Sequence, residues 1–216
     1  MTAILTYFPI RGRAEVIRLI LEEKGIAYQS DNIALEEWKT RRKQMPFKVV
    51  PVFQEGDVQI AESQAIVRHL ARKYQLYGRD EEEATRCDIL SEAIRDGMFE
   101  LGTLFWDEDF ASKRDAFVSK DLKHTLKNLE AYLNSYAHAK EYCVGDALTF
   151  ADFTLWNYLD WVRALAPETL QSYPTLCALK SATENRPRIQ AYLKSERRPP
   201  TITVSMAYYG TTPETS

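Results

Sequence analysis

The residue best placed for chemistry is Tyr7, at the end of a short β-type run over residues 3–8. The sequence Pro9-Ile10-Arg11-Gly12-Arg13 then leads into a helical pattern. In α/β units the carboxyl ends of strands face the ligand crevice, so this pattern places the phenol hydroxyl where it meets a bound molecule. The alternative is a half-buried strand residue whose hydroxyl is bonded within the protein.

Pro51 marks a second candidate feature, a place where a ligand pairs with the backbone. It lies in Val49-Val50-Pro51-Val52-Phe53, before a turn at Glu55-Gly56-Asp57. Because proline has no N–H to give to a ladder, it should stand at the start of a strand. A β-α-β-β-α unit with a proline there is typical of a thioredoxin-like fold, in which the proline is cis and leaves the backbone of Val50 free for a peptide-like ligand. A trans proline at a strand edge is the alternative.

Two further groups of residues are suited to charged ends of a ligand. Ser63 at a helix N-terminus offers its hydroxyl, its N–H and the positive end of the helix dipole to a carboxylate, and Glu62 could hold an ammonium group. Trp38, Arg42 and Lys43 could bind a second carboxylate. The alternatives are ordinary helix capping and solvated charges around an anchoring tryptophan. Taken together, these features describe a site for a short dicarboxylic peptide.

The elements that must position these residues form two groups. The first part of the chain has the predicted order β-α-β-loop-β-β-α, with Gly25 as the stop of its first helix and Ser63 as the cap of its second. Its strands are predicted over residues 3–8, 26–33, 49–53 and 58–60, its helices over 13–24 and 63–74, and a polar loop over 34–48.

After residue 78 the strand signals stop and helical patterns follow. Thr149-Phe150-Ala151-Asp152 is a capping box at the start of one of these helices. We therefore predict an α/β domain over residues 1–78 and an all-α domain over residues 79–216, which ends in a Pro- and Thr-rich tail. The helices are predicted over residues 81–109, 113–138, 149–165, 173–184 and 187–195.

The composition narrows the class of protein. With 216 residues and a net charge of -3, the chain has room for one or two compact domains. No apolar run approaches a membrane span and the first residues lack a signal-peptide pattern, so we expect a cytoplasmic protein with no membrane partner. The basic clusters Arg41-Arg42-Lys43 and Arg197-Arg198 are short and separate, which argues against nucleic acid. Cys87, Cys143 and Cys177 have neither metal-site nor CxxC spacing, so we expect reduced thiols and no metal.

Three segments carry a family resemblance over most of the chain, from about residue 3 to 195. The nine residues that start at Tyr7, the ten that start at Glu62, and the segment from Val144 to Phe153 resemble tyrosine-type cytosolic glutathione transferases. The resemblance is pi-like, with sigma-like features in Glu37-Trp38 and Met45-Pro46-Phe47. It implies an α/β thioredoxin-like N-terminal domain that binds glutathione, plus an all-α C-terminal domain with an electrophile pocket.

The implied activity is conjugation of the thiolate of reduced glutathione to hydrophobic electrophiles, a detoxification reaction of a homodimer. Glutathione would be a co-substrate, and no metal would take part. Tyr7 would donate a hydrogen bond to the glutathione sulfur, and Arg13 would add positive field. The other implied glutathione-binding residues are Trp38, Arg42, Lys43, Val49, Val50, Pro51, Glu62, Ser63 and, from the second subunit, Asp96. The implied electrophile pocket consists of Phe8, Ile10, Leu101, Phe105 and Trp106, closed by Tyr208 or Tyr209, and Phe47 is the implied key to the partner subunit.

Two departures from the family pattern stand in the glutathione site. Lys48-Val49 replaces the usual Gly-Gln, and Val49 cannot make the side-chain contact that glutamine makes. Glu62 replaces the glutamine of pi-like members. Two other functions remain open: a glutathione-binding scaffold without catalysis, such as a lens crystallin, and a glutathione-dependent isomerase of the prostaglandin synthase type. A thiol–disulfide oxidoreductase is disfavoured because no cysteine lies near the end of the first strand.

Overall fold

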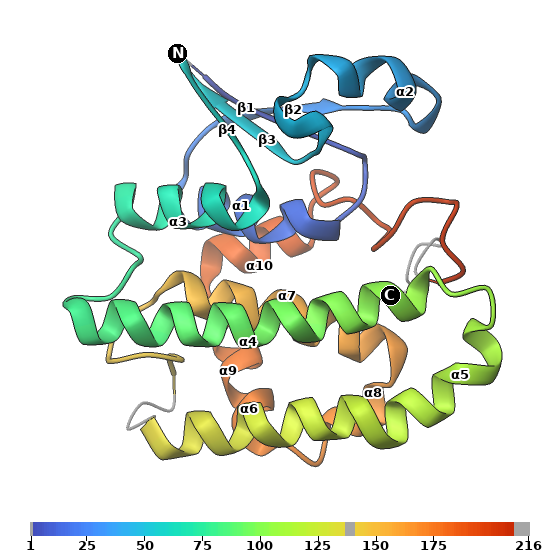
Figure 1. The fold of residues 1–216 in the computed structure, drawn as a ribbon. Coiled ribbons are helices and arrows are strands. Elements are labelled where there is room, and N and C mark those ends of the chain that lie inside the picture. Colours follow the sequence, from blue (N-terminus) through green and yellow to red (C-terminus); the bar gives the residue numbers. More distant parts are fainter. Residues whose placement is uncertain (1, 137–140, 210–216) are drawn as a thin grey trace.

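A four-stranded sheet forms one layer of the molecule, at the top of Figure 1. The computed structural model describes residues 2–136 and 141–209. The strands lie in the order β2-β1-β3-β4, with β1 parallel to β2 and antiparallel to β3, and with β4 antiparallel to β3. β1 is therefore a central strand, and it carries Tyr7 at its carboxyl end. The bounds are Ala3–Tyr7 for β1, Tyr28–Asn32 for β2, Val52–Glu55 for β3 and Val58–Ala61 for β4.

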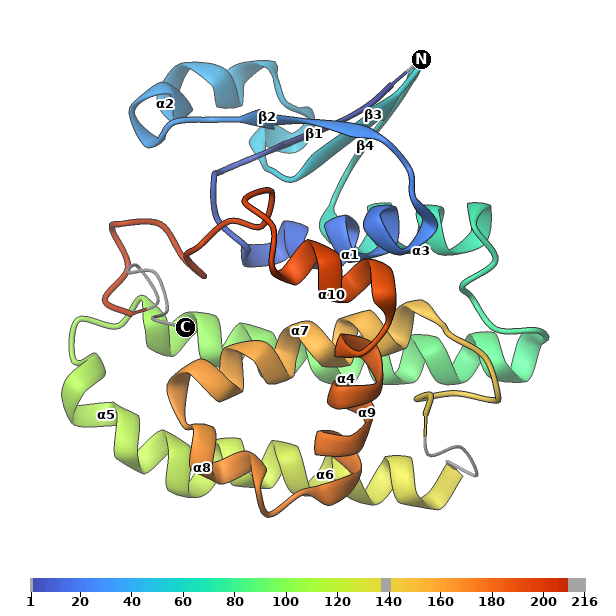
Figure 2. The same cartoon turned by 180° about the vertical axis from the view of Figure 1, so that it is seen from behind.

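The helices α1 and α3 cover the face of this sheet that is turned toward the helical layer (Figures 1 and 2). α1, Glu15–Lys24, follows a short 3₁₀ turn η1 at Gly12–Ala14, and α3 spans Ser63–Lys73. α1 ends where the sequence predicted, because Gly25 takes a left-handed conformation with φ 64° and donates its N–H to the carbonyl of Glu22. α3 buries four apolar residues on its inner face, Ile66, Val67, Leu70 and Ala71.

The segment predicted as a polar loop is instead a chain of short helical turns. Each turn closes its own hydrogen bonds, such as the one from Glu37 N–H to the Ala34 carbonyl at 3.0 Å. No turn is long enough to produce a hydrophobic period, so the pattern that identifies helices is missing here. The turns are η2 at Leu35–Glu37, α2 at Trp38–Arg41, η3 at Arg42–Gln44 and η4 at Pro46–Lys48.

Two boundaries near the predicted site differ from expectation. β3 begins at Val52 and not at Val49, directly after Pro51, which has no N–H for the ladder. The Val50–Pro51 peptide bond is cis, which is the thioredoxin-like alternative and not the trans one. Ser63 is the first residue of α3 and makes no capping hydrogen bond, whereas Glu62, with φ 68°, occupies the cap position. Ser63 as an N-cap was therefore wrong by one residue.

The second layer is helical and lies below α1 and α3 in Figure 1. The helix predicted over residues 113–138 is divided into α5 and α6 by the π-helical turn η5, and its predicted end at residues 137 and 138 lies outside the described residues. α8 was not predicted. In the described ranges, no helix combines the length and apolarity that a bilayer span requires. The bounds are α4 Glu81–Phe105, α5 Phe110–Phe117, η5 Val118–Leu122, α6 Lys123–Tyr136, α7 Phe150–Leu165, α8 Pro167–Leu170, α9 Pro174–Glu184 and α10 Pro187–Leu193.

α7 is the central helix of this layer and is buried along almost its whole length, between α4, α9 and α1. The predicted capping box starts it. Asp152 Oδ2 accepts hydrogen bonds from the N–H of Thr149 at 2.8 Å and from its hydroxyl at 2.9 Å. Asp152 Oδ1 accepts from the N–H of Cys143 at 2.7 Å, so the same carboxylate also anchors the preceding loop.

The segment after α10 returns to the sheet layer, as the red trace in Figure 2 shows. Its carbonyl groups accept hydrogen bonds from the loop that follows β1: Arg11 N–H donates to Thr201 at 2.8 Å, and Gly12 N–H donates to Ile202 at 3.1 Å. Further on, Tyr208 N–H donates to the carbonyl of Phe105 at 2.8 Å. This segment therefore joins the two layers. The domain boundary near residue 78, in the connection between α3 and α4, stays a prediction.

Candidate active site

A cleft of about 1150 Å³ opens between the sheet layer and the helical layer. Its walls come from the loop after β1, the start of α3, one face of α4, one face of α7 and the segment after α10. The cleft brings together these predicted site residues: Tyr7, Phe8, Ile10, Arg13, Val50, Glu62, Ser63, Asp96 and Trp106.

The Tyr7 hydroxyl lies at the sheet side of this cleft and is fixed by the backbone. The ring is buried, and Tyr7 Oη accepts a hydrogen bond from the N–H of Arg13 at 3.0 Å. Burial raises the pKa of the Tyr7 phenol, while the N–H of Arg13 and the charges of Arg13 and Arg18 oppose the rise only in part. The phenol is therefore protonated at neutral pH, and its own hydrogen is available to a ligand atom.

Gly12 makes this arrangement possible. A Cβ at this position would lie 2.5 Å from Tyr7 Oη, and the residue has φ +42°, a conformation that side chains disfavour. The backbone of the loop can therefore approach the hydroxyl only because residue 12 has no side chain. Sequence reasoning singled out the neighbouring Arg13 and missed Gly12.

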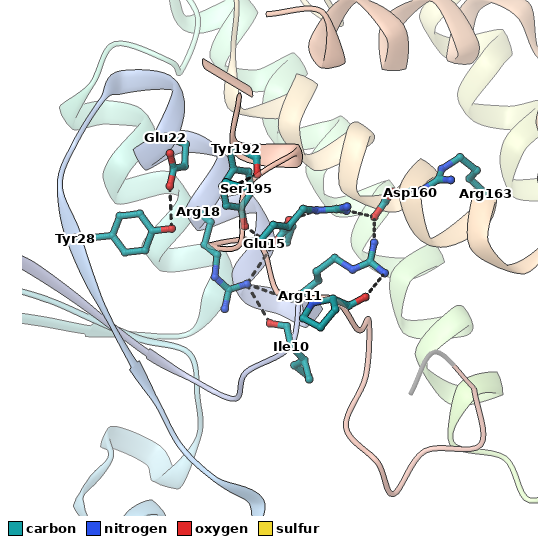
Figure 3. A network of polar contacts seen from close by, with 12 residues as sticks. Ile10, Arg11, Glu15, Arg18, Glu22, Tyr28, Asp160, Arg163, Tyr192 and Ser195 are labelled. Carbon is teal, nitrogen blue, oxygen red and sulfur yellow. Dashed lines mark hydrogen bonds and ion pairs between the residues drawn. The ribbon is translucent and has the colours of Figure 1, made fainter. Parts of the chain in front are cut away.

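The loop between β1 and η1, which leads into Gly12 and Arg13, is held by Arg18 of α1 (Figure 3). Arg18 Nη1 donates to the carbonyl of Ile10 at 3.1 Å and to the carbonyl of Arg11 at 3.3 Å, and it pairs with Glu15 at 3.0 Å. Burial alone would lower the pKa of Arg18, but the Glu15 carboxylate, together with Tyr192 and Tyr28, outweighs burial, and the net pKa is raised. Arg18 is thus a cation whose charge acts on Tyr7.

The start of α3 forms the end of the cleft suited to an amino-acid group. Glu62 is exposed, Ser63 is the first residue of the helix, and both line the cleft. Arg95 and Asp96 of α4 lie on the opposite wall and pair with each other at 3.1 Å. The resemblance implied an Asp96 from a second subunit; the chain's own Asp96 borders both this cleft and a smaller pocket between α4 and α6.

Several predicted glutathione-binding residues stand beside the cleft without lining it. The ring of Trp38 packs edge-on against Phe8, with centroids 5.3 Å apart, and Phe8 does line the cleft. The guanidinium of Arg42 lies 5.6 Å from the centre of the Trp38 ring. Trp38 and Arg42 thus reach the site through Phe8. The other predicted residues outside the lining are Lys43, Val49 and Pro51.

The far end of the cleft is mostly apolar, with aromatic rings from α4 and α7. Phe99 of α4 is largely exposed, Trp106, directly after α4, is half exposed, and Trp161 of α7 is buried in the cleft wall. Leu101 and Phe105, predicted for this pocket, are fully buried and do not line it. Instead, Phe105 stacks behind Trp161, with centroids 5.5 Å apart and planes at 19°.

The two tyrosines of the tail have different surroundings. Tyr208 is exposed and does not line the cleft. Tyr209 packs on Phe105 and Phe110, at 4.9 Å from each ring, and its hydroxyl donates to the carbonyl of Ala164. The tail residues in the cleft wall are Ile202, Thr203 and Val204.

The cleft also contains residues that sequence reasoning missed. The cleft-lining residues of α7 cannot be recognised from the sequence pattern, because nearly every position of that helix is buried and the pattern shows no distinct face. The tail contributors lie outside any periodic element. The missed residues are Gly12, Val16, Gln64, Val67, Ile94, Arg95, Met98, Phe99, Gly102, Thr103, Asp107, Thr154, Asn157, Trp161, Ile202, Thr203 and Val204.

These features define a class of protein: a thioredoxin-like domain, with a cis-proline before β3 and a tyrosine at the end of β1, joined to a helical domain across a shared cleft. Residues 3–72 match the family model described as glutathione S-transferase, N-terminal domain, and residues 95–196 match glutathione S-transferase, C-terminal domain. The chain therefore belongs to the glutathione S-transferase family, and it is a transferase with glutathione as its co-substrate.

Individual relatives agree with this assignment. The chain is 36% identical to a glutathione S-transferase of Dirofilaria immitis, over 87% of this chain and 90% of that protein. It is 34% identical to glutathione S-transferase P 1 of Xenopus laevis, over 90% of this chain and 93% of that protein. The solved structure of the pi-class glutathione S-transferase of Onchocerca volvulus superposes with a TM-score of 0.89 and 31% identity, over 96% of this chain and 100% of that chain.

Proposed function

We propose that the chain joins the sulfur of reduced glutathione to hydrophobic electrophiles, as a detoxification reaction, and that Tyr7 activates the thiol. The observation that carries this proposal is the fixed Tyr7 hydroxyl, buried at the cleft, protonated, and held at 3.0 Å by the N–H of Arg13. In the proposed reaction the thiol proton leaves to solvent, the thiolate sulfur forms a bond to the electrophilic carbon, and the leaving group departs with its electron pair.

The site must stabilise the thiolate of glutathione relative to its thiol. A free thiol of pKa about 8.5 is only a few per cent ionised at pH 7. A decrease of about two units, worth about 2.7 kcal/mol, makes thiolate the major form. One neutral hydrogen bond supplies only about 1 kcal/mol. The remainder must come from positive charge, and the cations near the Tyr7 hydroxyl are Arg13 and Arg18.

We assign the rest of the glutathione molecule by chemistry. Glu62 and Ser63 would hold the γ-glutamyl end, because the first suits an ammonium group and the second offers a helix N-terminus to a carboxylate. The backbone of Val50, beside the cis-proline Pro51, would pair with the cysteinyl part. The glycyl carboxylate would lie toward Trp38. Arg42 and Lys43 would supply its counter-charge, and Val49 would contribute backbone only.

We assign the electrophile to the apolar end of the cleft. Phe8 and Ile10 border it on the sheet side, and Trp106, directly after α4, borders it on the other. Aromatic walls of this kind favour flat, apolar electrophiles over charged ones.

We also propose a cytoplasmic homodimer in which Phe47 enters the partner subunit. The Phe47 ring is 81% exposed, which is unusual for a phenylalanine, and its backbone has φ 52°. The same chain has an apolar pocket of about 310 Å³ between α4 and α6, which a ring from a second copy could fill. The free thiols of the three cysteines fit a reducing compartment. The pocket residues include Ile89, Leu90, Ala93, Gly97, Leu129 and Tyr132.

The dimer is tested by sedimentation of wild type and Phe47→Ala. We expect a dimeric mass for wild type and a dissociation constant raised about thirtyfold for the variant, as for an interface hot spot. Exposed Phe99 provides the control, since Phe99→Ala removes a ring of the same size away from that pocket. A monomeric wild type at micromolar concentration would contradict the dimer.

The function is tested by conjugation of glutathione to chlorodinitrobenzene, with wild type and Tyr7→Phe side by side. Activity in wild type and a large loss in the variant are expected. A wild type that is inactive but retained on immobilised glutathione would support the scaffold or the isomerase. Turnover of an endoperoxide would then separate these two. A protein that neither reacts nor binds glutathione would indicate that Val49 has abolished glutathione binding.

A further inference from the structure

The loop between β1 and η1 is tied to the helical layer by a buried ion pair that the thiol chemistry does not itself use. The Arg11 side chain is buried, and its Nη1 donates to Asp160 Oδ2 of α7 at 2.8 Å. Its Nη2 donates to the carbonyl of Pro200 at 3.3 Å. The side chain of this loop residue therefore bonds to a helix and to the segment after α10, both remote in sequence (Figure 3).

Asp160 is the centre of this network. Its side chain is 1% exposed. Besides the hydrogen bond from Arg11, it accepts hydrogen bonds from Arg198 at 2.7 Å and from Arg163 at 3.0 Å. Burial by itself would raise the pKa of Asp160, but the guanidinium groups of Arg198, Arg11 and Arg163 together outweigh burial and hold the pKa below its ordinary value. Asp160 is therefore a buried carboxylate ion with guanidinium groups around it.

Arg198 extends the network to the backbone of the loop. Its Nε donates to Glu15 at 3.1 Å, and Glu15 also receives Arg18 at 3.0 Å and the Tyr192 hydroxyl at 3.1 Å. A few residues after Arg198, the segment accepts the N–H groups of Arg11 and Gly12 through its own carbonyls. Asp160 thus holds the loop in two ways, through the side chain of Arg11 and through the segment that binds the loop backbone.

Stability alone is a weak reason for such an arrangement. Transferring ions out of water costs about as much as a buried pair returns, and apolar residues of the same volume often stabilise more. A guanidinium–carboxylate pair does fix the relative orientation of its two side chains, because its hydrogen bonds constrain angles as well as distances. Here the fixed chain runs from Arg11 through Gly12 to Arg13, whose N–H holds the Tyr7 hydroxyl.

We propose that Asp160 is a positioning residue for thiol activation: through Arg11 and Arg198 it sets the loop whose N–H orients the Tyr7 hydroxyl toward the glutathione sulfur. The inference rests on the proposed role of Tyr7. Asp160 itself touches no substrate. Its effect should therefore be seen in the thiol pKa of bound glutathione and much less in glutathione affinity, since the groups assigned to bind the two ends of glutathione lie elsewhere.

The test is Asp160→Asn, which keeps the shape of the side chain and removes its charge. Bound thiolate is titrated against pH by its ultraviolet absorbance, and kcat and KM are measured over the same range. We expect the thiol pKa to rise by about one unit, which is about a tenfold loss of thiolate at low pH. We expect kcat to recover at high pH and KM for glutathione to change by less than about twofold. An unchanged thiol pKa in the folded variant overturns the proposal.

Glu23→Gln is the matched control. Glu23 of α1 pairs with Arg186 at 2.6 Å, so it also ties the sheet layer to the helical layer, but it does not contact the loop after β1. We expect it to leave the thiol pKa unchanged. An equal shift in both variants would mean general loosening between the layers and would also overturn the proposal.

Two further variants make the result decisive. If Asp160→Asn does not fold, Arg198→Gln, at the more accessible edge of the network, is titrated in the same way, and its thiol pKa decides. Tyr7→Phe distinguishes the role of Tyr7 from the role of Asp160. If Tyr7→Phe leaves the thiol pKa unchanged, the proposed role of Tyr7 is overturned, and so is the proposed positioning role of Asp160. If Tyr7→Phe shifts the thiol pKa and the network variants do not, only the positioning is overturned.

Discussion

Two segments border the same glutathione site and are built in opposite ways. The loop after β1 has buried residues at Arg11 and Gly12, and its contacts reach α1, α7 and the segment after α10. The chain of turns from Leu35–Glu37 to Pro46–Lys48 has no buried residue, and its cap hydrogen bonds are local. The first segment is bonded to distant parts of the fold, and the second is held by its own hydrogen bonds and a few surface contacts.

The difference follows from what each segment has to do. A hydroxyl that stabilises developing charge must be oriented before the reaction, because reorganising it during the reaction costs as much as it returns. A carboxylate at the end of a flexible peptide needs only cations within reach, and these tolerate motion. The comparison predicts that changes in the first segment affect kcat, and that changes in the second affect KM for glutathione.

The largest effect should come from Tyr7→Phe, which removes only the hydroxyl. We expect kcat to fall about a hundredfold, the loss typical of one oriented donor. KM for glutathione should change by less than about threefold, because the groups that bind the two ends of glutathione remain. Steady-state kinetics at saturating electrophile measure both, and equal turnover in the two proteins would remove Tyr7 as the activator.

The next effect should come from Gly12→Ala. The new Cβ would lie 2.5 Å from Tyr7 Oη at a residue with φ +42°, so either the hydroxyl or the loop must move. We expect kcat to fall about tenfold or more and the free energy of unfolding to fall by about 1–3 kcal/mol. Gly102→Ala is the control on the opposite wall, because a Cβ there meets nothing within 4 Å. Similar loss of kcat in both variants would contradict the special role of the loop.

A smaller effect should come from the second segment. The double variant Arg42→Ala with Lys43→Ala removes two exposed cations assigned to the glycyl carboxylate. We expect KM for glutathione to rise about fivefold at low salt, less at high salt, with kcat within about twofold. Lys39→Ala, an exposed cation on the same segment, should leave KM unchanged. A fall in kcat with KM unchanged would reverse the comparison.

The smallest effect should come from Arg41→Ala. Arg41 pairs with Asp31 of β2, and both side chains are about one-third exposed. Surface pairs of this kind contribute about 0.2–1 kcal/mol, so the free energy of unfolding in urea should fall by no more than that. The loss should shrink as salt is added. A loss of several kcal/mol would show that the second segment is held as firmly as the first.

Local patterns predicted much of the fold. The stop at Gly25 and the capping box at Thr149 and Asp152 each depend on residues close in sequence, and the structure confirms them. For Pro51 the sequence left cis and trans open, and the structure has the cis bond of the thioredoxin-like pattern. The turns between residues 34 and 48 were missed because each is too short for a hydrophobic period. Leu101 and Phe105 are hidden from the cleft because their face of α4 packs inward, which a helical pattern without a partner cannot reveal.

The sequence by itself determined the order of elements, the family resemblance and the tyrosine at the end of the first strand, because these are written in neighbouring residues. Only the tertiary structure decided how that tyrosine is held. Arg11 and Asp160 are 149 positions apart, and Arg198 and Glu15 are 183 apart. Ion pairs between residues so far apart produce no recognisable sequence pattern, because each partner by itself looks like an ordinary charged residue. Only the folded structure shows that these charges are buried together.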